Sequence, residues 1–139
     1  MRPAIMAEIQ TYPGSYSATD IATQLRLRPS IVAREVRAAT RAGLIAPRRW
    51  RLTQNARASL QGGRAVARLV WGSSTRSDGL ALAERAVRAL RIAPLAERDL
   101  AQILTGGSRL AGGSRRALAG LERIGIVSPP SCLWPAVAS

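Results

Sequence analysis

The sequence contains no phenylalanine, no histidine and no lysine, and it has a single cysteine, Cys132. A core without phenylalanine must be built from Leu, Ile, Val and Ala, which suits packed helices better than a β-sandwich. One cysteine cannot form an intrachain disulfide, and without histidine the usual structural zinc sites and His-dependent catalytic arrangements cannot be assembled. Neither a pair of acidic residues nor a glycine-rich phosphate loop ending in lysine suggests a reaction. We therefore expect a protein that is not an enzyme and has no metal or cofactor.

Long apolar runs are also missing. No stretch approaches the roughly 20 residues needed to cross a bilayer. The first residues contain Glu8 and lack the apolar core and cleavage pattern of a signal peptide. We expect a cytoplasmic protein without membrane contact.

Positive charge dominates the sequence. The 139 residues include 21 basic residues, all arginine, and 8 acidic residues, which gives a net charge of +13. A GC-rich genome would explain the choice of arginine over lysine, but it does not explain the shortage of acids. Such a surplus in a small protein indicates a polyanionic partner, most commonly nucleic acid.

Two segments repeat one order of elements, which predicts a tandem repeat. The first segment has apolar residues at helical spacing in 3–10, 20–27 and 31–43, followed by short strand patterns at 44–45 and 50–53. Ser17 or Thr19, Ser30 and Thr53 are predicted N-caps, with Thr53 opening a fourth helix over 54–61 and a further helical pattern at 64–71. Val32, Val36 and either Ala39 or Thr40 are expected to face inward.

The second segment follows a stretch rich in glycine and serine. It predicts helices at 80–92, 95–104 and 108–125 and strands at 126–127 and 132–134. Its expected inward residues include Leu100, Ile103, Leu104 and Ile124. The predicted division is residues 1–71 for unit 1, 72–79 for a linker and 80–139 for unit 2. The predicted fold is mainly α, with short β-wings.

Residues 20–45 resemble the helix-turn-helix of winged-helix transcriptional regulators. The matching features are Ile21-Ala22, Leu25, Leu27, Pro29-Ser30, Val32, Arg34, Val36 and the closing run Ala42-Gly43-Leu44-Ile45, followed by a turn and Arg51-x-Thr53. The resemblance covers about residues 5–60. The second segment is similar more loosely, because Ala101 to Gly125 spans three residues more than Ala22 to Gly43 and includes Gly112-Gly113. We expect the extra residues to lengthen its turn or its third helix, so that unit 2 keeps the fold without a standard recognition helix.

The resemblance implies two tandem winged-helix-turn-helix units that bind double-stranded DNA, with the third helix of unit 1 in the major groove. Arg34, Arg37 and Arg41 share one face of that helix by spacing. The expected DNA contacts are Ser30, Ile31, Arg34, Arg37, Arg41, the wing residues Arg48, Arg49 and Arg51, and Arg115 and Arg116 of unit 2. Alternate strand positions point in opposite directions, so the three wing arginines cannot all serve equally. Trp50 and Trp134 are expected to pack the wings against the core.

These features favour a small sequence-specific transcriptional regulator that is associated with the nucleoid. Its compact size would also suit a phage or mobile element. Residues 1–72 have 12 arginines and 3 acids, against 9 and 5 in residues 73–139, so unit 1 is the expected main DNA surface. Unit 2 would then contact DNA again, form a homodimer or bind a protein partner. The alternative is a tandem winged-helix scaffold for chromosome segregation, replication or phage packaging that mainly docks a protein.

Overall fold

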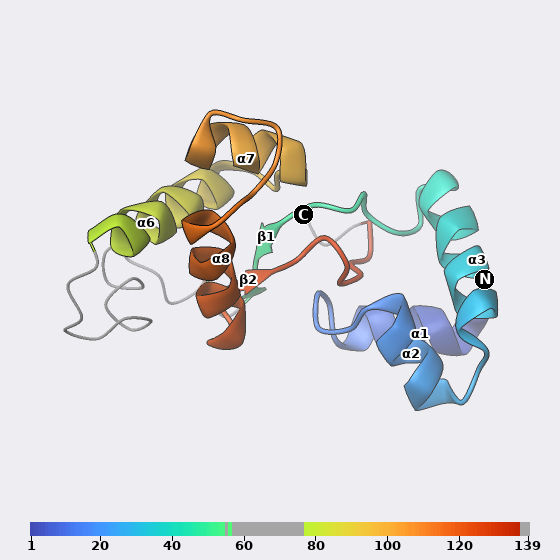
Figure 1. Cartoon of the computed structure of the whole chain (residues 1–139). Coiled ribbons are helices and arrows are strands. Elements are labelled where there is room, and N and C mark those ends of the chain that lie inside the picture. Colours follow the sequence, from blue (N-terminus) through green and yellow to red (C-terminus); the bar gives the residue numbers. More distant parts are fainter. Residues whose placement is uncertain (55, 57–76, 137–139) are drawn as a thin grey trace. The chain divides into compact units, whose positions relative to one another are not determined.

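The chain is mainly helical, with a small antiparallel sheet, in a computed structural model that describes residues 1–54, 56 and 77–136 (Figure 1). The described helices are α1 (Pro3–Thr11), α2 (Ala18–Leu25), α3 (Pro29–Arg41), α6 (Ser77–Ile92), α7 (Glu97–Thr105) and α8 (Gly113–Arg123). The strands are β1 (Arg51–Leu52) and β2 (Val127–Ser128). The predicted helix over 64–71 and most of that over 54–61 lie outside the described residues.

The chain forms two compact units, and each is described by its own residues. Unit 1 consists of residues 1–48 and 130–139, and unit 2 of residues 49–129. This division differs from the predicted one at 71/72 and 79/80. The predicted linker lies partly outside the described residues, and its residues 77–79 belong to α6.

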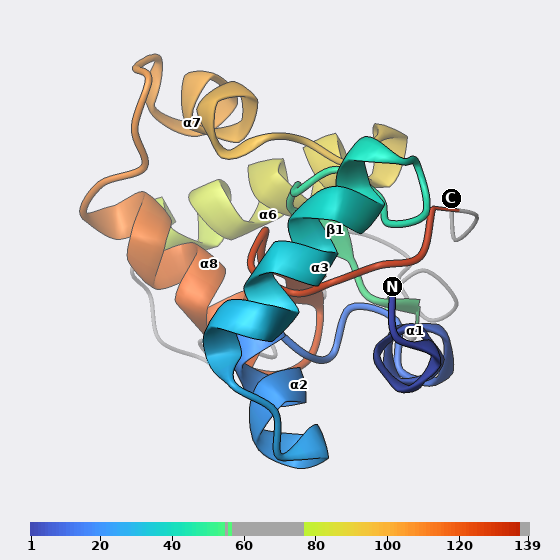
Figure 2. The same ribbon diagram turned by 90° about the vertical axis from the view of Figure 1, so that its right-hand side faces the viewer.

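Unit 1 contains three helices whose ends follow from local sequence. Ser17 and Asp20 form a capping box at the start of α2, in which the Ser17 N–H donates to the Asp20 carboxylate at 2.9 Å and the Asp20 N–H donates to the Ser17 hydroxyl at 3.2 Å. Arg26 ends α2 in the left-handed region, with φ of 55°. A short turn then leads into α3, as Figure 2 shows, with Pro29 at the first position, which suits its missing N–H.

Unit 2 repeats this order with a longer turn. Gly106 ends α7 with φ of 74°, at the place that Arg26 occupies in unit 1. Seven residues separate α7 from α8, whereas three separate α2 from α3. The third helix does not begin at residue 108 as predicted, because Gly112 takes a φ of 52° and serves as the N-cap of α8. Starting there keeps Gly112 out of the helix, where it would cost about 1 kcal/mol relative to alanine.

The final strand of each unit comes from the other half of the sequence. In unit 1, residues 132–135 run between two segments, with bridges from Cys132 to Ser17 and from Pro135 to Ile45. The Ala46 N–H donates to the Trp134 carbonyl at 2.9 Å, and the Ala136 N–H donates to the Leu44 carbonyl at 3.2 Å. The C-terminal segment thus completes the unit that contains the N-terminus.

Residues 50–53 occupy the equivalent place in unit 2. Trp50 and Leu95 exchange two backbone hydrogen bonds, of 2.7 and 3.0 Å. Leu52 then pairs with Val127, and the Thr53 N–H donates to the Ile126 carbonyl at 3.0 Å, as the Ala136 N–H does to Leu44. The strands expected within each segment do not pair with each other. Residues 50–53 pair with Leu95 and with Val127, and residues 132–135 pair with Ser17 and with Ile45.

Each unit has its own apolar core. In unit 1, Leu133 joins the inward faces of the three helices; the buried set is Ile5, Ile9, Ile21, Ala22, Val32, Val36, Ala39, Ile45 and Leu133. In unit 2, Trp50, Leu52 and Val127 join residues of α6, α7 and α8. The expected inward residues Val32, Val36 and Ala39 are confirmed. Ile103 and Ile124 were wrongly predicted to face inward, since they are 45% and 40% exposed.

Trp50 and Trp134 are both buried, as predicted for packing residues. Trp134 is 6% exposed and its indole lies directly over Gly14, where φ of +74° and the closeness of the ring leave no room for a side chain. Trp50 is 7% exposed and packs in unit 2. Each tryptophan therefore fixes an exchanged strand to the core of the unit that receives it.

Thr53 forms the side-chain hydrogen bond expected of an N-cap, although most of the helix predicted to follow it lies outside the described residues. Its hydroxyl accepts a hydrogen bond from the Ala56 N–H at 3.2 Å and donates to the Gly125 carbonyl at 2.6 Å. Ser30 is not the N-cap of α3, because Arg28 takes that position and Pro29 is the first helical residue.

Candidate nucleic-acid interface

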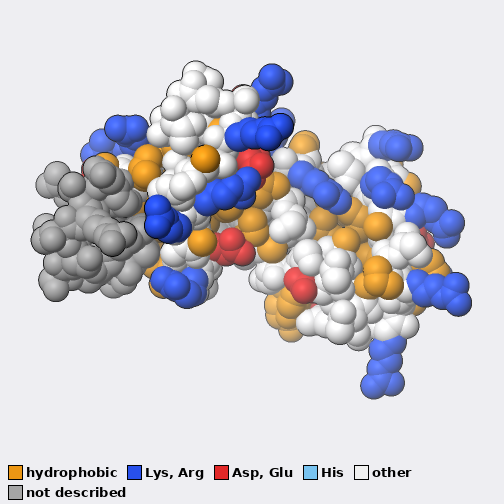
Figure 3. Space-filling model, viewed as in Figure 1, with side chains coloured by type: hydrophobic (Ala, Val, Ile, Leu, Met, Phe, Trp, Pro, Cys, Tyr) orange, Lys and Arg blue, Asp and Glu red, His pale blue; other side chains and the backbone are white. Residues whose placement is uncertain are grey.

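The solvent-facing side of α3 has three arginines. Val32, Val36 and Ala39 turn the opposite side of this helix into the core of unit 1. Arg34, Arg37 and Arg41 are exposed. In the face shown in Figure 3, arginine side chains gather on the part of unit 1 over α3. The helix thus has the amphipathic form that a groove-binding helix needs, with apolar residues inward and cations outward.

These arginines have no acidic partner within the described part of the chain. Arg34, Arg37 and Arg41 form no ion pair or hydrogen bond there, and neither does Arg48. The other charged residue of α3, Glu35, is bound instead by Arg2, with 3.4 Å between Nε and Oε2. Four guanidinium groups therefore remain available to an external anion.

Two arginines of α3 lie beside an arginine from the segment that follows it. Arg37, Arg41 and Arg48 line one hollow of about 460 Å³, together with Val36 and Thr40. The structure thus brings together two predicted helix contacts and one predicted wing contact, whereas Arg34 lies outside this hollow. A concave surface with three guanidinium groups suits phosphate oxygens, which arginine binds through paired N–H donors.

Thr40 belongs to this hollow and was not among the predicted site residues. Its hydroxyl donates to the Val36 carbonyl at 2.8 Å, an ordinary arrangement for threonine within a helix. The sequence predicts Thr40 as an alternative to Ala39 for the inward-facing position. For that reason Thr40 is not among the residues predicted for the binding surface.

Ser30 and Ile31 lie in the first turn of α3. Ser30 is exposed and Ile31 half-buried. The free N–H groups and positive dipole end of a helix favour anions at this position. Ser30 and Ile31 thus lie at the end of α3 where the sequence predicts DNA contacts, and these contacts stay a prediction.

The three predicted wing arginines are divided between the two units. Arg48 belongs to unit 1, whereas Arg49 and Arg51 belong to unit 2. Arg49 is exposed, but Arg51 is only 6% exposed and sits in β1 opposite Ser128. Arg51 is therefore poorly placed for the predicted DNA contact, because its side chain is buried in unit 2.

In unit 2, Arg115 and Arg116 lie in the first turn of α8 and are exposed. Arg115 is already engaged: its Nε donates to the Leu110 carbonyl at 3.0 Å, and it lies 3.9 Å from the Glu97 carboxylate. Arg116 forms no such contact among the described residues. Of the two, Arg116 is the freer to meet an anion.

The observed division of the chain changes the charge argument. Unit 1 holds seven arginines and three acids, a net charge of +4, and unit 2 holds fourteen arginines and five acids, a net charge of +9. The predicted excess in the N-terminal half came from arginines after residue 48, which belong to unit 2. The case for unit 1 therefore depends on the arrangement of its arginines and not on its net charge.

Two features are missing from the described residues. They contain no group of three acidic or cysteine side chains close enough to hold a metal ion. None of the helices described combines the length and apolar character required to span a bilayer.

Comparisons with protein-family models, with curated proteins and with solved structures found no match to this chain.

Proposed function

We propose that this chain is a sequence-specific double-stranded DNA-binding protein, of the kind that serves as a small transcriptional regulator, built from two winged-helix units. The observation that carries the proposal is the row of unpaired arginines on α3 beside Arg48. Each unit has three helices and short antiparallel pairings between extended segments, which support the winged-helix assignment.

In this proposal α3 enters the major groove, which is about 12 Å wide and admits one helix. Arg34, outside the arginine hollow, would point to base edges, where an arginine can bind guanine O6 and N7 together. Arg37, Arg41 and Arg48 would hold the phosphate backbone at the rim of the groove. The apolar side of α3 would keep this presentation fixed against the core of unit 1.

The test is a fluorescence-anisotropy titration with random-sequence duplex DNA at 50 and 200 mM salt, followed by selection of sequences from the bound pool. A protein that neutralises six to ten phosphates should lose about 10³–10⁵ in affinity between these concentrations. We expect that dependence, together with an enriched motif. Weak binding with little salt dependence and no motif would contradict the proposal.

A second candidate function is a scaffold or assembly protein that mainly docks a protein partner. Unit 2 favours it, because its lengthened turn shortens the third helix to 11 residues, from 13 in unit 1. Exposed apolar residues on α6 and α7 favour it further. The same titration separates the two functions, since a protein-docking module needs no steep salt dependence for DNA.

A further inference from the structure

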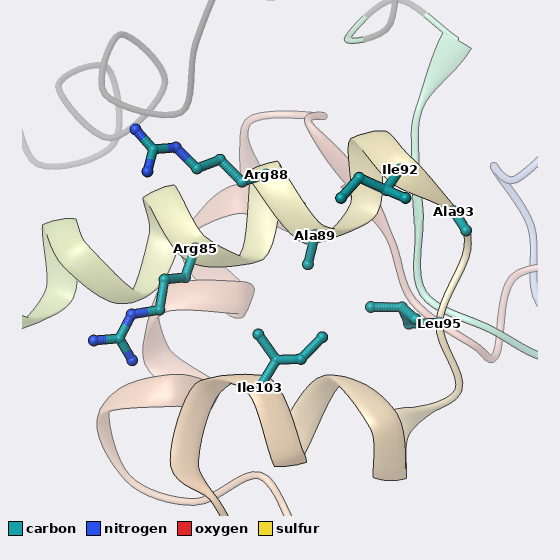
Figure 4. Close-up of a pocket in the computed structure, with 7 residues that line it drawn as sticks. All are labelled: Arg85, Arg88, Ala89, Ile92, Ala93, Leu95 and Ile103. Atoms are coloured by element: carbon teal, nitrogen blue, oxygen red, sulfur yellow. The ribbon is translucent and has the colours of Figure 1, made fainter.

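Unit 2 has an open apolar hollow between α6 and α7. Its volume is about 420 Å³ (Figure 4). The lining residues are Arg85, Arg88, Ala89, Ile92, Ala93, Leu95 and Ile103. In Figure 4, Ala89 and Ile103 point from the two helices toward the space between them, and Leu95 closes one end.

The hollow leaves large apolar side chains in water. Ile92 is 88% exposed and Ile103 is 45% exposed. Covering an isoleucine side chain removes apolar surface from water, so two such residues on one surface favour a partner that shields them. Isolated exposed residues need no explanation, but these two border the same hollow.

Besides the side that is buried in the core, α6 has a second regular row of side chains, which borders the hollow. Val87 and Leu90 lie on the side buried in the core of unit 2, whereas Arg85, Ala89 and Ile92 recur at i, i+4 and i+7 on another side. Side chains at this spacing form one continuous face along a helix. This face is apolar at Ala89 and Ile92 and charged at Arg85. Together with Ile103 of α7, it offers a surface on which an amphipathic helix can lie.

The charged residues beside the hollow indicate that its partner is acidic. Both charged residues that line the hollow are arginines of α6. Arg88 is paired with Glu84 at 2.7 Å, but Arg85 forms no ion pair or hydrogen bond within the described residues. In Figure 4, the Arg85 side chain extends past the end of the hollow opposite Leu95. A partner that places a carboxylate there gains an ion pair at the rim of an apolar contact.

A second copy of this chain fits poorly. A twofold contact would place the same patch on both sides, and therefore arginines against arginines in a chain of net charge +13. A small molecule fits poorly as well, since small-ligand sites bury about 70–90% of their ligand, whereas this hollow leaves Ile92 almost fully exposed.

We propose that the hollow between α6 and α7 binds an acidic amphipathic helix of another protein, with Ile92 and Ile103 covering its apolar side and Arg85 pairing with one of its carboxylates. This site lies in unit 2 and shares no residue with the DNA surface proposed on α3. It does not depend on DNA binding, and either proposal can fail without the other.

The experiment uses the full chain and a fluorescein-labelled synthetic helix with leucines at i, i+4 and i+7 and glutamates along both flanks. Two further peptides serve as controls, one with lysine for every glutamate and one with the same residues scrambled. We expect saturable binding of the acidic helix below about 100 μM, at least tenfold weaker binding of the lysine peptide, and no measurable binding of the scrambled one.

Variants locate the site. Ile92→Glu and Ile103→Glu should each weaken peptide binding at least tenfold, and Arg85→Gln should weaken it severalfold and reduce its salt dependence. Ile124→Glu is the matched control, because Ile124 is 40% exposed in the same unit but does not line the hollow. Thermal melting checks that each variant folds. The affinity for DNA should change by the same amount in all three glutamate variants, because each adds one negative charge.

Several outcomes would overturn the proposal. Absence of peptide binding up to 1 mM would do so, as would equal binding of the scrambled peptide or an equally weakened Ile124→Glu variant. A concentration-dependent dimer in sedimentation that Ile92→Glu dissociates would assign the surface to a second copy instead. If Ile92→Glu and Ile103→Glu lost DNA binding and Ile124→Glu did not, the hollow between α6 and α7 would be a DNA-binding surface instead.

Discussion

The backbone N–H of Ala46 donates to the carbonyl of Trp134 at 2.9 Å, although 88 residues separate them in the chain. This hydrogen bond lies beside the bridge between Ile45 and Pro135, which joins the C-terminal segment to unit 1. Its equivalent in unit 2 joins β1 and β2, so the two halves of the sequence exchange their final strands. Several consequences of this exchange can be measured.

Leu133→Ala should destabilise the helices at the other end of the sequence. Leu133 is 3% exposed in the core formed with α1, α2 and α3. Removing a buried leucine side chain typically costs about 2–5 kcal/mol. We expect lower protection of the amides of α1–α3 in native-state hydrogen exchange.

Leu52→Ala is the reciprocal variant. Leu52 is 1% exposed in the core formed with α6, α7 and α8, and its truncation should lower protection in those helices. If each substitution instead weakened the helices on its own side of the sequence, the exchange of strands would be wrong.

Gly14→Ala should be more damaging than Gly43→Ala. Both glycines have positive φ, 74° and 78°, which costs a residue with a Cβ about 1–2 kcal/mol. A Cβ at Gly14 would also overlap the Trp134 indole, whereas one at Gly43 meets no atom within 4 Å. Displacing the ring adds about 1–3 kcal/mol. Urea unfolding of both variants measures the difference, and equal destabilisation would contradict the packing of Trp134 on Gly14.

Arg37→Gln combined with Arg41→Gln should weaken DNA binding and reduce its salt dependence. The two side chains line the hollow beside Arg48 and have no acidic partner among the described residues. Removing one arginine that binds a phosphate should lower the slope of log K against log salt by about one. Anisotropy titrations at several salt concentrations give this slope.

The control removes the same kind of charge elsewhere. Arg98→Gln changes an exposed arginine of α7 that lines no hollow beside α3. If this variant lowered the slope as much as one of the two α3 substitutions does, DNA binding would follow net charge alone.

Arg51→Ala should affect stability more than DNA binding. Arg51 is 6% exposed within β1, and its side chain fills space in unit 2. We expect a decrease of about 1–3 kcal/mol in unfolding free energy and little change in the salt slope. Arg49→Ala, at an exposed neighbouring position, should do the reverse. A lower salt slope for Arg51→Ala with unchanged melting would restore Arg51 as a DNA contact.

Sequence patterns predicted the helices well because their signals are local. The spacing of Val32, Val36 and Ala39 and the Ser17 cap were enough to place α2 and α3 within two residues. The arginine row on α3 followed from the same spacing, and its exposure agrees with the prediction.

The pairing of strands could not be predicted in the same way. Residues 50–53 and 132–135 have similar short extended patterns, and either could complete either sheet by its alternation alone. The choice depends on contacts such as Trp134 on Gly14 and Trp50 with Leu95, which join residues far apart in sequence. For the same reason, local sequence patterns could not predict that Arg51 is buried or that it belongs to a different unit from Arg48.

The exchanged strands also set the order in which the protein can finish folding. Ile45 must wait for Pro135, which is made 90 residues later. At about 5–20 residues per second, this is a delay of roughly 5–20 s during synthesis. Through that time α1, α2 and α3 lack Leu133 and Trp134 over their apolar sides. The N-terminal half of the nascent chain is therefore the half that a ribosome-bound chaperone would meet for longest.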